Sequence, residues 1–254
     1  MTNWQIPSSN QLPSINHLLG ALPPADYARV VRSLDVISLE LKQTVHKAGE
    51  PVEHVYFPGG GFVSMLTVLE DGSMVEISTI GREGVTGLPA AMNGQPSFCE
   101  TFVQGAAPTC WRMSIAAFHR ELEHRGTFYE LVSRYNYVLA GLFMQSTACN
   151  ATHSVEQRLS RWLLMAQDRM EADDFPLTQE FVAMMLGASR PMVTVVAGTL
   201  QNAGLITYHR GHLTIVDREK LEAASCECYR VSAHLLKRVT AKAGGKWASL
   251  TATP

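Results

Sequence analysis

The sequence predicts an α+β fold that consists of an N-terminal antiparallel β-roll, a long helix and a C-terminal winged helix-turn-helix. Three observations predict it: glycine-punctuated β-rich runs between residues 36 and 114, a helical repeat of apolar residues from 125 to 153, and helix-turn-helix spacing over 183–198. We place the domain boundaries at 1–124 for the β-roll, 125–153 for the long helix, 154–222 for the winged helix-turn-helix, and 223–254 for a C-terminal helix and loose tail.

The β-roll prediction rests on short runs of β-branched and aromatic residues. After a helical lead-in over 14–35, these runs are 52–57, 62–69, 74–80 and 101–104. Strands at this spacing, bounded by turns, indicate a barrel or a cupin-like jelly roll. The Asp-Gly pair within 70–73 predicts a hairpin turn. Residues 59–61, all glycine, lack the Gly-Lys-Ser/Thr of a phosphate loop, so we interpret them as a tight turn.

The long helix carries apolar residues at spacings of three and four, which is typical of a coiled-coil dimer seam. No charged residue lies between Arg134 and Glu156, which favours a partner strand, whereas packing of the helix on its own domain is the alternative. Gln145 would be a polar interruption that sets the register. The predicted dimerisation residues are Leu131, Tyr135, Val138, Leu142, Gln145 and Cys149.

Capping residues define the helices of the C-terminal domain. Ser154 and Gln157 form a predicted capping box that starts a helix ending near 171–176. Thr178 is the predicted N-cap of the first helix of the helix-turn-helix, which closes at Gly187. The second helix begins after a second N-cap, Ser189, with Pro191 in its first turn, and ends near 202–204.

The second helix has the two faces of a recognition helix. Val193, Val196, Ala197 and Leu200 form its apolar stripe, so Arg190 and Thr194 face outward. An arginine can donate two hydrogen bonds to guanine, and a threonine can contact the thymine methyl group or a phosphate. Residues 205–216 read as two strands with alternating side chains on either side of an Arg-Gly turn. This pattern predicts a wing whose tip lies along the phosphate backbone of DNA. The predicted DNA contacts are Thr178, Ser189, Arg190, Pro191, Thr194, Val195, His209 and Arg210.

The bulk composition limits the function classes. The chain has 254 residues, 46% apolar content and a formal charge of −2. It therefore lacks the strongly basic composition that many nucleic-acid-binding proteins show. Its surplus of acidic residues lies in the N-terminal half. No apolar run long enough for a bilayer and no export signal are visible, which predicts a cytoplasmic protein with no membrane partner. Five cysteines without CxxC pairing predict reduced thiols. No nucleophile–base, metalloprotease or nucleotide-loop motif appears, so we expect no enzyme activity.

The order of β-roll, long helix and winged helix-turn-helix resembles the Crp/Fnr superfamily over about residues 15–222, most specifically over 177–193, 200–206 and the wing. The resemblance implies a cyclic-nucleotide-binding-like sensor domain and a bacterial transcriptional regulator. It further implies a homodimer on a two-fold symmetric operator, with RNA polymerase as a candidate partner. The effector is not identified by the sequence. A protein-interaction module, in which the winged helix binds a protein instead of DNA, is the alternative, supported by the near-neutral charge of 154–239.

The chain departs from the cyclic-AMP binders of this family at the residues that bind DNA and ligand. Pro191 and Val195 stand where those proteins carry a glutamate and a second arginine, so only Arg190 carries over and the operator is expected to differ. Leu88 replaces the ribose-binding glutamate, and Cys99-Glu100 replaces the phosphate-binding Arg-Ser pair. A carboxylate repels a phosphate, so we expect no cyclic-AMP binding and predict no cofactor.

Other sensor chemistry has weaker support in the sequence. The first cysteine is Cys99, which disfavours the N-terminal iron–sulfur cluster of one branch of the family. His46 and His54 leave haem harder to exclude, although isolated histidines are usually structural. Cys149 and His153, four residues apart on one helical face, could bind metal or respond to oxidation. The side chains of the cysteines at 226 and 228 are expected to alternate in direction and not to converge on one point. The sequence therefore predicts no metal site.

Overall fold

A computed structural model describes residues 15–209 and 211–240, and it confirms the predicted α+β fold. Two antiparallel sheets form the β-roll, with strand orders β1-β7-β3 and β2-β6-β4-β5. The strands are β1 (Asp35–Leu39), β2 (Thr44–His46), β3 (His54–Pro58), β4 (Phe62–Val68), β5 (Met74–Ile80), β6 (Glu100–Gly105) and β7 (Ala107–Ser114). The sequence pattern did not predict β1, β2 or β7.

Short helices surround the roll, and the predicted turns are confirmed. Residues 59–61 connect β3 to β4, and 69–73 connect β4 to β5, with Gly72 at φ 81°. Glycine is suited to such left-handed turn positions because it has no Cβ. The helical lead-in contains α1 (His17–Gly20), α2 (Pro24–Val30) and the 3-10 turn η2 (Val31–Ser33), and α3 (Ala90–Asn93) and α4 (Ile115–Glu123) follow later in the chain.

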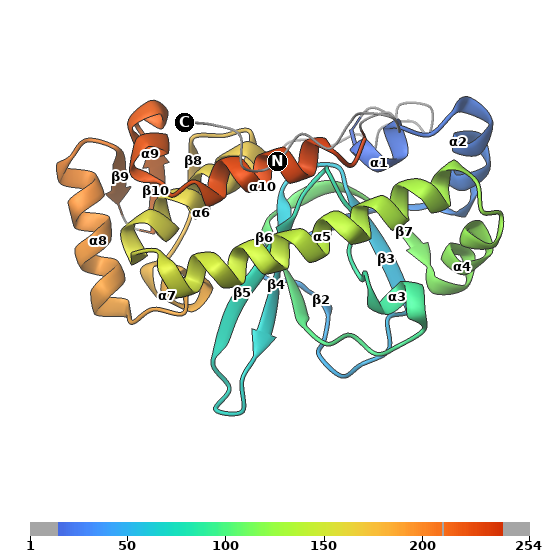
Figure 1. Cartoon of the computed structure of the whole chain (residues 1–254), viewed down its shortest axis with the longest axis horizontal. Helices are drawn as coiled ribbons and strands as arrows, with labels where there is room; N and C mark the ends of the chain where they lie inside the picture. Colours follow the sequence, from blue (N-terminus) through green and yellow to red (C-terminus); the bar gives the residue numbers. More distant parts are fainter. Residues whose placement is uncertain (1–14, 210, 241–254) are drawn as a thin grey trace, which may run out of the picture.

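The long helix α5 (Thr127–Thr152) runs across the β-roll and leads to the winged helix-turn-helix domain, where α8 (Arg190–Asn202) lies at the far end of the molecule (Figure 1). Helix α10 (Cys228–Lys237) packs along α5. The remaining elements are α6 (Val155–Met170), β8 (Asp174–Pro176), α7 (Gln179–Leu186), α8 (Arg190–Asn202), β9 (Ile206–His209), β10 (His212–Ile215) and α9 (Arg218–Ala224).

Two apolar clusters hold these parts together. The first fills the β-roll and includes one face of α5 together with Leu235 and Val239 near the C-terminal end of α10. The second joins the helices of the DNA-binding domain to Phe62, Leu66 and Phe102 of the β-roll. Because the second cluster contains residues from both domains, the roll and the DNA-binding domain bury apolar surface against each other.

Most of the predicted dimer seam is covered within its own chain, and only Gln145, which is half-buried, lines the groove between α5 and α10. Leu131, Tyr135, Val138 and Leu142 are buried in the core of their own chain, and Cys149 is buried among other cysteines. The physical reason is that α5 packs against the β-roll and α10, so this apolar stripe is already covered within one chain. Packing of the helix on its own domain, the alternative interpretation of the repeat, accounts for this face.

A second stripe on α5 is exposed instead. Tyr137 and Met144 are 60% and 72% exposed, respectively. Together with Ala140, Gly141 and Ala148 they line a groove of about 440 Å³ between α5 and α10. Tyr137 and Met144 are each offset by one residue from predicted seam positions, which corresponds to about 100° around an α-helix.

Candidate DNA-binding surface

The helix-turn-helix is formed by α7 and α8, whose axes are bent by 107°. Each boundary follows from a local cap. The hydroxyl of Thr178 accepts a hydrogen bond from Phe181 N at 3.3 Å, and Gly187 adopts φ 55° between the helices. Ser189 is the N-cap of α8, although its side chain makes no capping bond. An angle in this range is typical of helix-turn-helix units.

The outward face of α8 carries the predicted contact residues. Val193, Ala197 and Leu200 are buried and Val196 is half-buried, which leaves Arg190, Pro191 and Thr194 exposed. Val195 and Met192 are 69% and 49% exposed, respectively. The hydroxyl of Thr194 lies 2.7 Å from Gln179 Oε1 and 3.0 Å from the carbonyl oxygen of Arg190. Its proton is therefore already engaged within the motif.

The wing is also formed. Strands β9 and β10 pair antiparallel, with Ile215 opposite Ile206, and β8 adds a third strand that the sequence pattern did not predict. His209 is exposed at the end of β9. Arg210, the predicted wing-tip contact, lies outside the described residues. Tyr208 connects the wing to the segment before α7, because its hydroxyl donates a hydrogen bond to the carbonyl oxygen of Leu177 at 2.5 Å.

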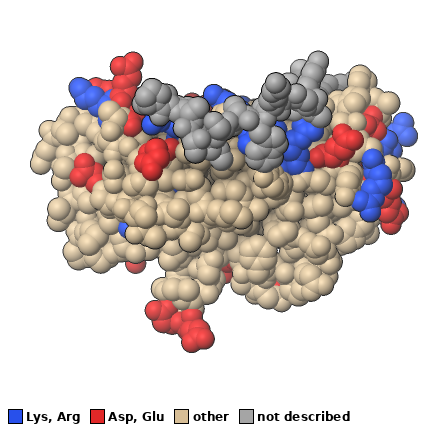
Figure 2. Space-filling model, viewed as in Figure 1, with Lys and Arg blue, Asp and Glu red and all other residues tan. Residues whose placement is uncertain are grey.

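Few charges lie on this part of the surface. Arg190 is the only charged residue in the sequence of α8. Figure 2 shows that much of the visible face is uncharged, with charged side chains mainly along one edge and an acidic group at the tip of the β4–β5 hairpin. The motif therefore has the geometry to enter a groove, whereas its described part carries little of the positive charge that drives non-specific DNA binding.

A buried polar contact connects the β-roll to α6. The indole N–H of Trp162 donates to Glu76 Oε1 at 3.0 Å, and the hydroxyl of Ser64 lies 2.6 Å from Glu76 Oε2. Burial raises the pKa of the Glu76 carboxyl to about 7, although these two hydrogen bonds act in the opposite direction. The sequence analysis missed Glu76, even though a lone glutamate within the apolar strand 74–80 was a visible signal.

Ion pairs and aromatic rings extend this contact. Arg169 of α6 lies 2.6 Å from Glu83 of the β-roll, and both side chains are largely buried. At the other side, the rings of Phe102 and Phe181 meet edge to face with centroids 5.6 Å apart. The interdomain contact thus combines apolar burial with paired charges.

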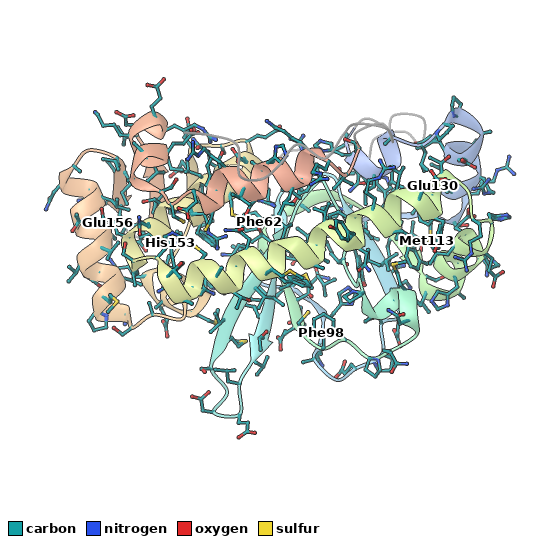
Figure 3. All side chains as sticks on the ribbon, in the orientation of Figure 1. Phe62, Phe98, Met113, Glu130, His153 and Glu156 are labelled. Atoms are coloured by element: carbon teal, nitrogen blue, oxygen red, sulfur yellow. The ribbon has the colours of Figure 1, made fainter. Side chains whose placement is uncertain are left out.

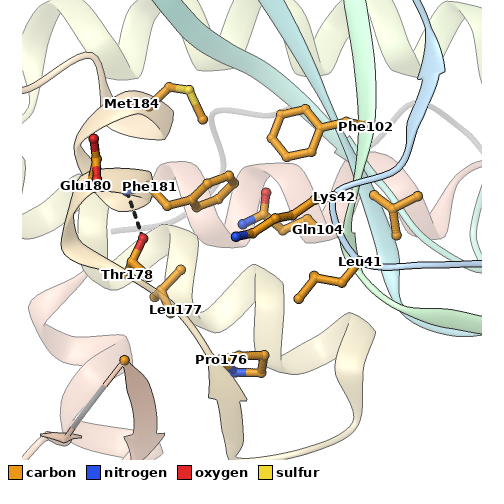
Figure 4. Close-up of a pocket in the computed structure, with 12 residues that line it drawn as sticks. Leu41, Lys42, Phe102, Gln104, Pro176, Leu177, Thr178, Glu180, Phe181 and Met184 are labelled. Carbon is orange, nitrogen blue, oxygen red and sulfur yellow. Dashed lines mark hydrogen bonds between the residues drawn. The ribbon is translucent and has the colours of Figure 1, made fainter.

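A cleft of about 540 Å³ lies beside this contact (Figure 4). The β-roll contributes Lys42, Phe102 and Gln104, and the DNA-binding domain contributes Phe181 and Met184 from α7. Thr178, a predicted phosphate contact, lies at its edge, with its hydroxyl turned toward Phe181 N. The cleft is therefore bounded by both domains, and its shape depends on how they dock.

Two of the positions compared with cyclic-nucleotide binders are occupied by core side chains, and the third, Glu100, is half-buried. Leu88 and Cys99 are buried in the apolar cluster of the β-roll, and Glu100 lies in β6 opposite Leu66. His46 is buried, its Nε2 lies 2.9 Å from Thr86 Oγ1, and burial lowers its pKa to about 4. These contacts give Leu88 and His46 packing roles in the fold.

The prediction that the cysteines at 226 and 228 would not converge is wrong. Both lie at the turn that starts α10, and their sulfur atoms meet those of Cys149 and the ring of His153. The four potential ligand atoms lie within 4.8 Å of one another. Figure 3 shows His153 where α5 ends, next to the start of α10. A pair of residues two apart alternates in a strand, but at the entry to a helix the backbone turns and brings both side chains together.

The described residues contain no single helix with the length and apolar character of a membrane span. Helices α7 and α8 meet that criterion only as a bent pair, and this pair is the helix-turn-helix itself.

Comparisons with known proteins agree with this architecture. A family described as the cyclic nucleotide-binding domain matches residues 36–125, and one described as the Crp-like helix-turn-helix domain matches 157–224, so the two cover more than half of the chain. No curated protein matches the sequence.

Solved structures share the fold at low identity. A protein described as a Crp/Fnr-family transcriptional regulator from Eubacterium rectale is 15% identical with a TM-score of 0.65, over 82% of this chain and 97% of that one. FixK2 from Bradyrhizobium japonicum is 16% identical with a TM-score of 0.58, over 76% and 98%. The c-di-GMP responsive regulator CLP from Xanthomonas campestris is 15% identical with a TM-score of 0.58, over 76% and 99%.

Proposed function

Because the chain belongs to the Crp/Fnr family of transcriptional regulators, we propose that it acts as a homodimer that binds a two-fold symmetric DNA site, with α8 of each copy in the major groove. The observation that carries this proposal is the pair α7 and α8, bent by 107°, with the outward face of α8 uncovered and a wing beside it. RNA polymerase is the candidate protein partner of the bound dimer.

Each predicted contact residue receives a role from its geometry. Arg190 reads a guanine, since it is exposed at the first turn of α8. Ser189 has a hydroxyl without a capping bond and binds phosphate, as does Thr178 at the start of α7. Thr194 and Val195 offer methyl groups to thymine, with Pro191 packed beside them. His209 and Arg210 of the wing contact the phosphate backbone.

The dimer forms through the exposed stripe of α5. Tyr137 and Met144 are the large apolar side chains there, and the small residues Ala140, Gly141 and Ala148 allow a second helix to approach closely. A stripe with apolar residues at spacings of three and four is suited to an antiparallel or parallel helix pair. The stripe therefore favours a second copy of the chain as the occupant of the groove between α5 and α10.

The β-roll acts as the sensor for an unidentified signal. Its signal can reach α8 through the contact at Glu76, Trp162 and Arg169, because these side chains connect the roll to α6. A signal shifts the regulator only if it binds one docking arrangement more tightly than another. The interdomain cleft, lined by both domains, is where a ligand would make such a distinction.

Selection of genomic fragments by the purified protein, with and without cell extract, tests the proposal. We expect one preferred sequence with two-fold symmetry and half-sites about 34–36 Å apart. Affinity should fall as salt rises, because phosphate contacts release counterions. If no sequence is enriched and binding is insensitive to salt, the alternative applies: the exposed Met192 and Val195 would then serve a protein-binding helix.

A further inference from the structure

The buried cluster of Cys149, His153, Cys226 and Cys228 lies outside the DNA-binding surface and outside both large apolar cores. Cys149 is in the last turn of α5, and His153 is the C-cap of that helix. Cys226 lies between α9 and α10, and Cys228 is the first residue of α10. We propose that these four side chains hold a zinc ion that joins the end of the long helix to the start of α10.

The spacing of the ligand atoms fits a tetrahedral site. The Cys149 and Cys226 sulfur atoms are 3.6 Å apart, and the Cys228 sulfur lies 3.6 Å from His153 Nδ1. Bonds of about 2.3 Å to sulfur and about 2.0–2.1 Å to nitrogen place two sulfur atoms about 3.8 Å apart and a sulfur and a nitrogen about 3.5 Å apart. The thiols are not joined by a disulfide. The two measured distances therefore match edges of a zinc tetrahedron, and all four ligand atoms lie within 4.8 Å of one another.

The chemistry of the four ligands selects the metal. Three thiolates and one imidazole form a soft sulfur–nitrogen set, which favours Zn²⁺ over ions that prefer oxygen. Four protein ligands fill a tetrahedral ion completely, so the site is structural and leaves no position for a reacting water. Binding forms three Zn–S bonds and one Zn–N bond and releases three protons from the thiols to solvent, with no change in oxidation state.

Side chains around the ligands orient them. His153 Nε2 lies 3.2 Å from Glu227 Oε2, and the other ring nitrogen, Nδ1, faces the Cys228 sulfur. Gln145 donates a hydrogen bond to the Cys228 sulfur at 3.0 Å. A carboxylate behind a metal-bound histidine fixes its tautomer and strengthens the ligand. The surroundings of the cluster thus match those of a metal site.

Two arginines supply positive charge next to the thiols. Arg158 and Arg161 are buried, the Nε atom of each has no partner among the described residues, and both interact electrostatically with Cys149. A zinc ion bound to three thiolates carries a net negative charge, which these guanidinium groups offset. Arg158 also donates a hydrogen bond to the carbonyl oxygen of Leu186 at 2.9 Å, at the end of α7. The site is therefore connected to the helix-turn-helix through one side chain.

Metal analysis of the purified full-length chain tests the proposal without reference to DNA. We expect about one zinc ion per chain after dialysis. Cobalt added to the metal-free, reduced protein should give the visible absorption of tetrahedral cobalt and a thiolate-to-cobalt charge-transfer band. Cys228→Ser and Cys226→Ser should lose both signals, whereas Cys99→Ala, which removes a buried cysteine of the β-roll, should keep them.

A second pair of variants covers the case in which a cysteine substitution prevents folding. Glu227 is an exposed side chain, so Glu227→Gln should fold and bind zinc about 10–100-fold more weakly. Glu219→Gln, exposed on α9, is the matched control and should bind as the unchanged protein does. The proposal is overturned if the reduced protein binds neither metal. It is also overturned if Cys226→Ser and Cys228→Ser fold and retain as much metal as Cys99→Ala, or if mass analysis finds only a Cys149–Cys226 disulfide.

Discussion

The contact between the β-roll and the DNA-binding domain contains buried ionisable side chains, whereas the outer faces of α5 and α8 contain almost none. Glu76, Glu83 and Arg169 are enclosed at the contact. The exposed stripe of α5 is formed by Tyr137, Met144 and small residues, and α8 carries one charge. A buried charge depends strongly on its partners and on pH, whereas an uncharged exposed face acts through shape and apolar burial. We therefore expect pH to act on domain docking, and we expect a single charge added to or removed from the exposed faces to change partner binding.

The largest expected effect follows from placing a charge on the uncharged face of α5. Met144→Glu puts two like charges at a two-fold seam, so we expect a monomer by light scattering. Loss of the second copy removes the gain from two linked recognition helices, and DNA affinity should fall by about 100-fold or more. Phe98→Glu, at an exposed apolar residue of the β-roll, is the control and should remain dimeric. A Met144→Glu protein that stays dimeric would place the interface elsewhere.

Removal of an ionisable group from the interdomain contact should have the next largest effect. Burial raises the pKa of Glu76 to about 7 from its ordinary value of 4.5, so its contribution to folding is fully present below pH 4.5 and is lost as pH rises through about 7. A shift of this size corresponds to about 3 kcal/mol at most. Glu76→Gln should therefore flatten the decline of the melting temperature between pH 5 and 8.

The control for this pH dependence lies on the same hairpin. Glu70→Gln changes an exposed carboxyl at the hairpin tip, so the pH profile of its melting temperature should match that of the unchanged protein. Equal profiles for the Glu76→Gln and unchanged proteins would show that the buried carboxyl is not the source of the pH dependence.

Removal of the single charge of α8 should weaken DNA binding at one base position. Arg190→Ala is expected to cost about 1–3 kcal/mol. Arg190→Lys should recover only part of this loss, because lysine lacks the rigid, planar pair of donors of a guanidinium. Titration of operator variants at each base pair measures this loss. Arg230→Ala, which changes an exposed arginine of α10, should leave affinity unchanged. A uniform loss over all sequences would assign Arg190 to phosphate instead.

Local signals and long-range packing explain what the sequence could predict. Thr178, Gly187 and Ser189 define the helix-turn-helix because a cap depends only on residues within one turn. The apolar repeat of α5 predicted a long helix, but the stripe that it assigned to a partner packs on its own chain. Periodicity does not distinguish a stripe that packs on its own chain from one that binds another copy. The meeting of Cys149 with Cys226 joins residues far apart in sequence, and no local pattern encodes it.

The smallest expected effect tests whether the hydroxyl of Thr194 contacts DNA. This hydroxyl is already engaged with Gln179 and with the carbonyl oxygen of Arg190, so the methyl group is the part left to face a base. Thr194→Val keeps that methyl group and should change DNA affinity by less than about 1 kcal/mol. Thr199→Val, whose hydroxyl bonds to Val195 O further along α8, is the matched control. A larger loss for Thr194→Val, equal over all operator variants, would show that its hydroxyl leaves Gln179 to bind a phosphate.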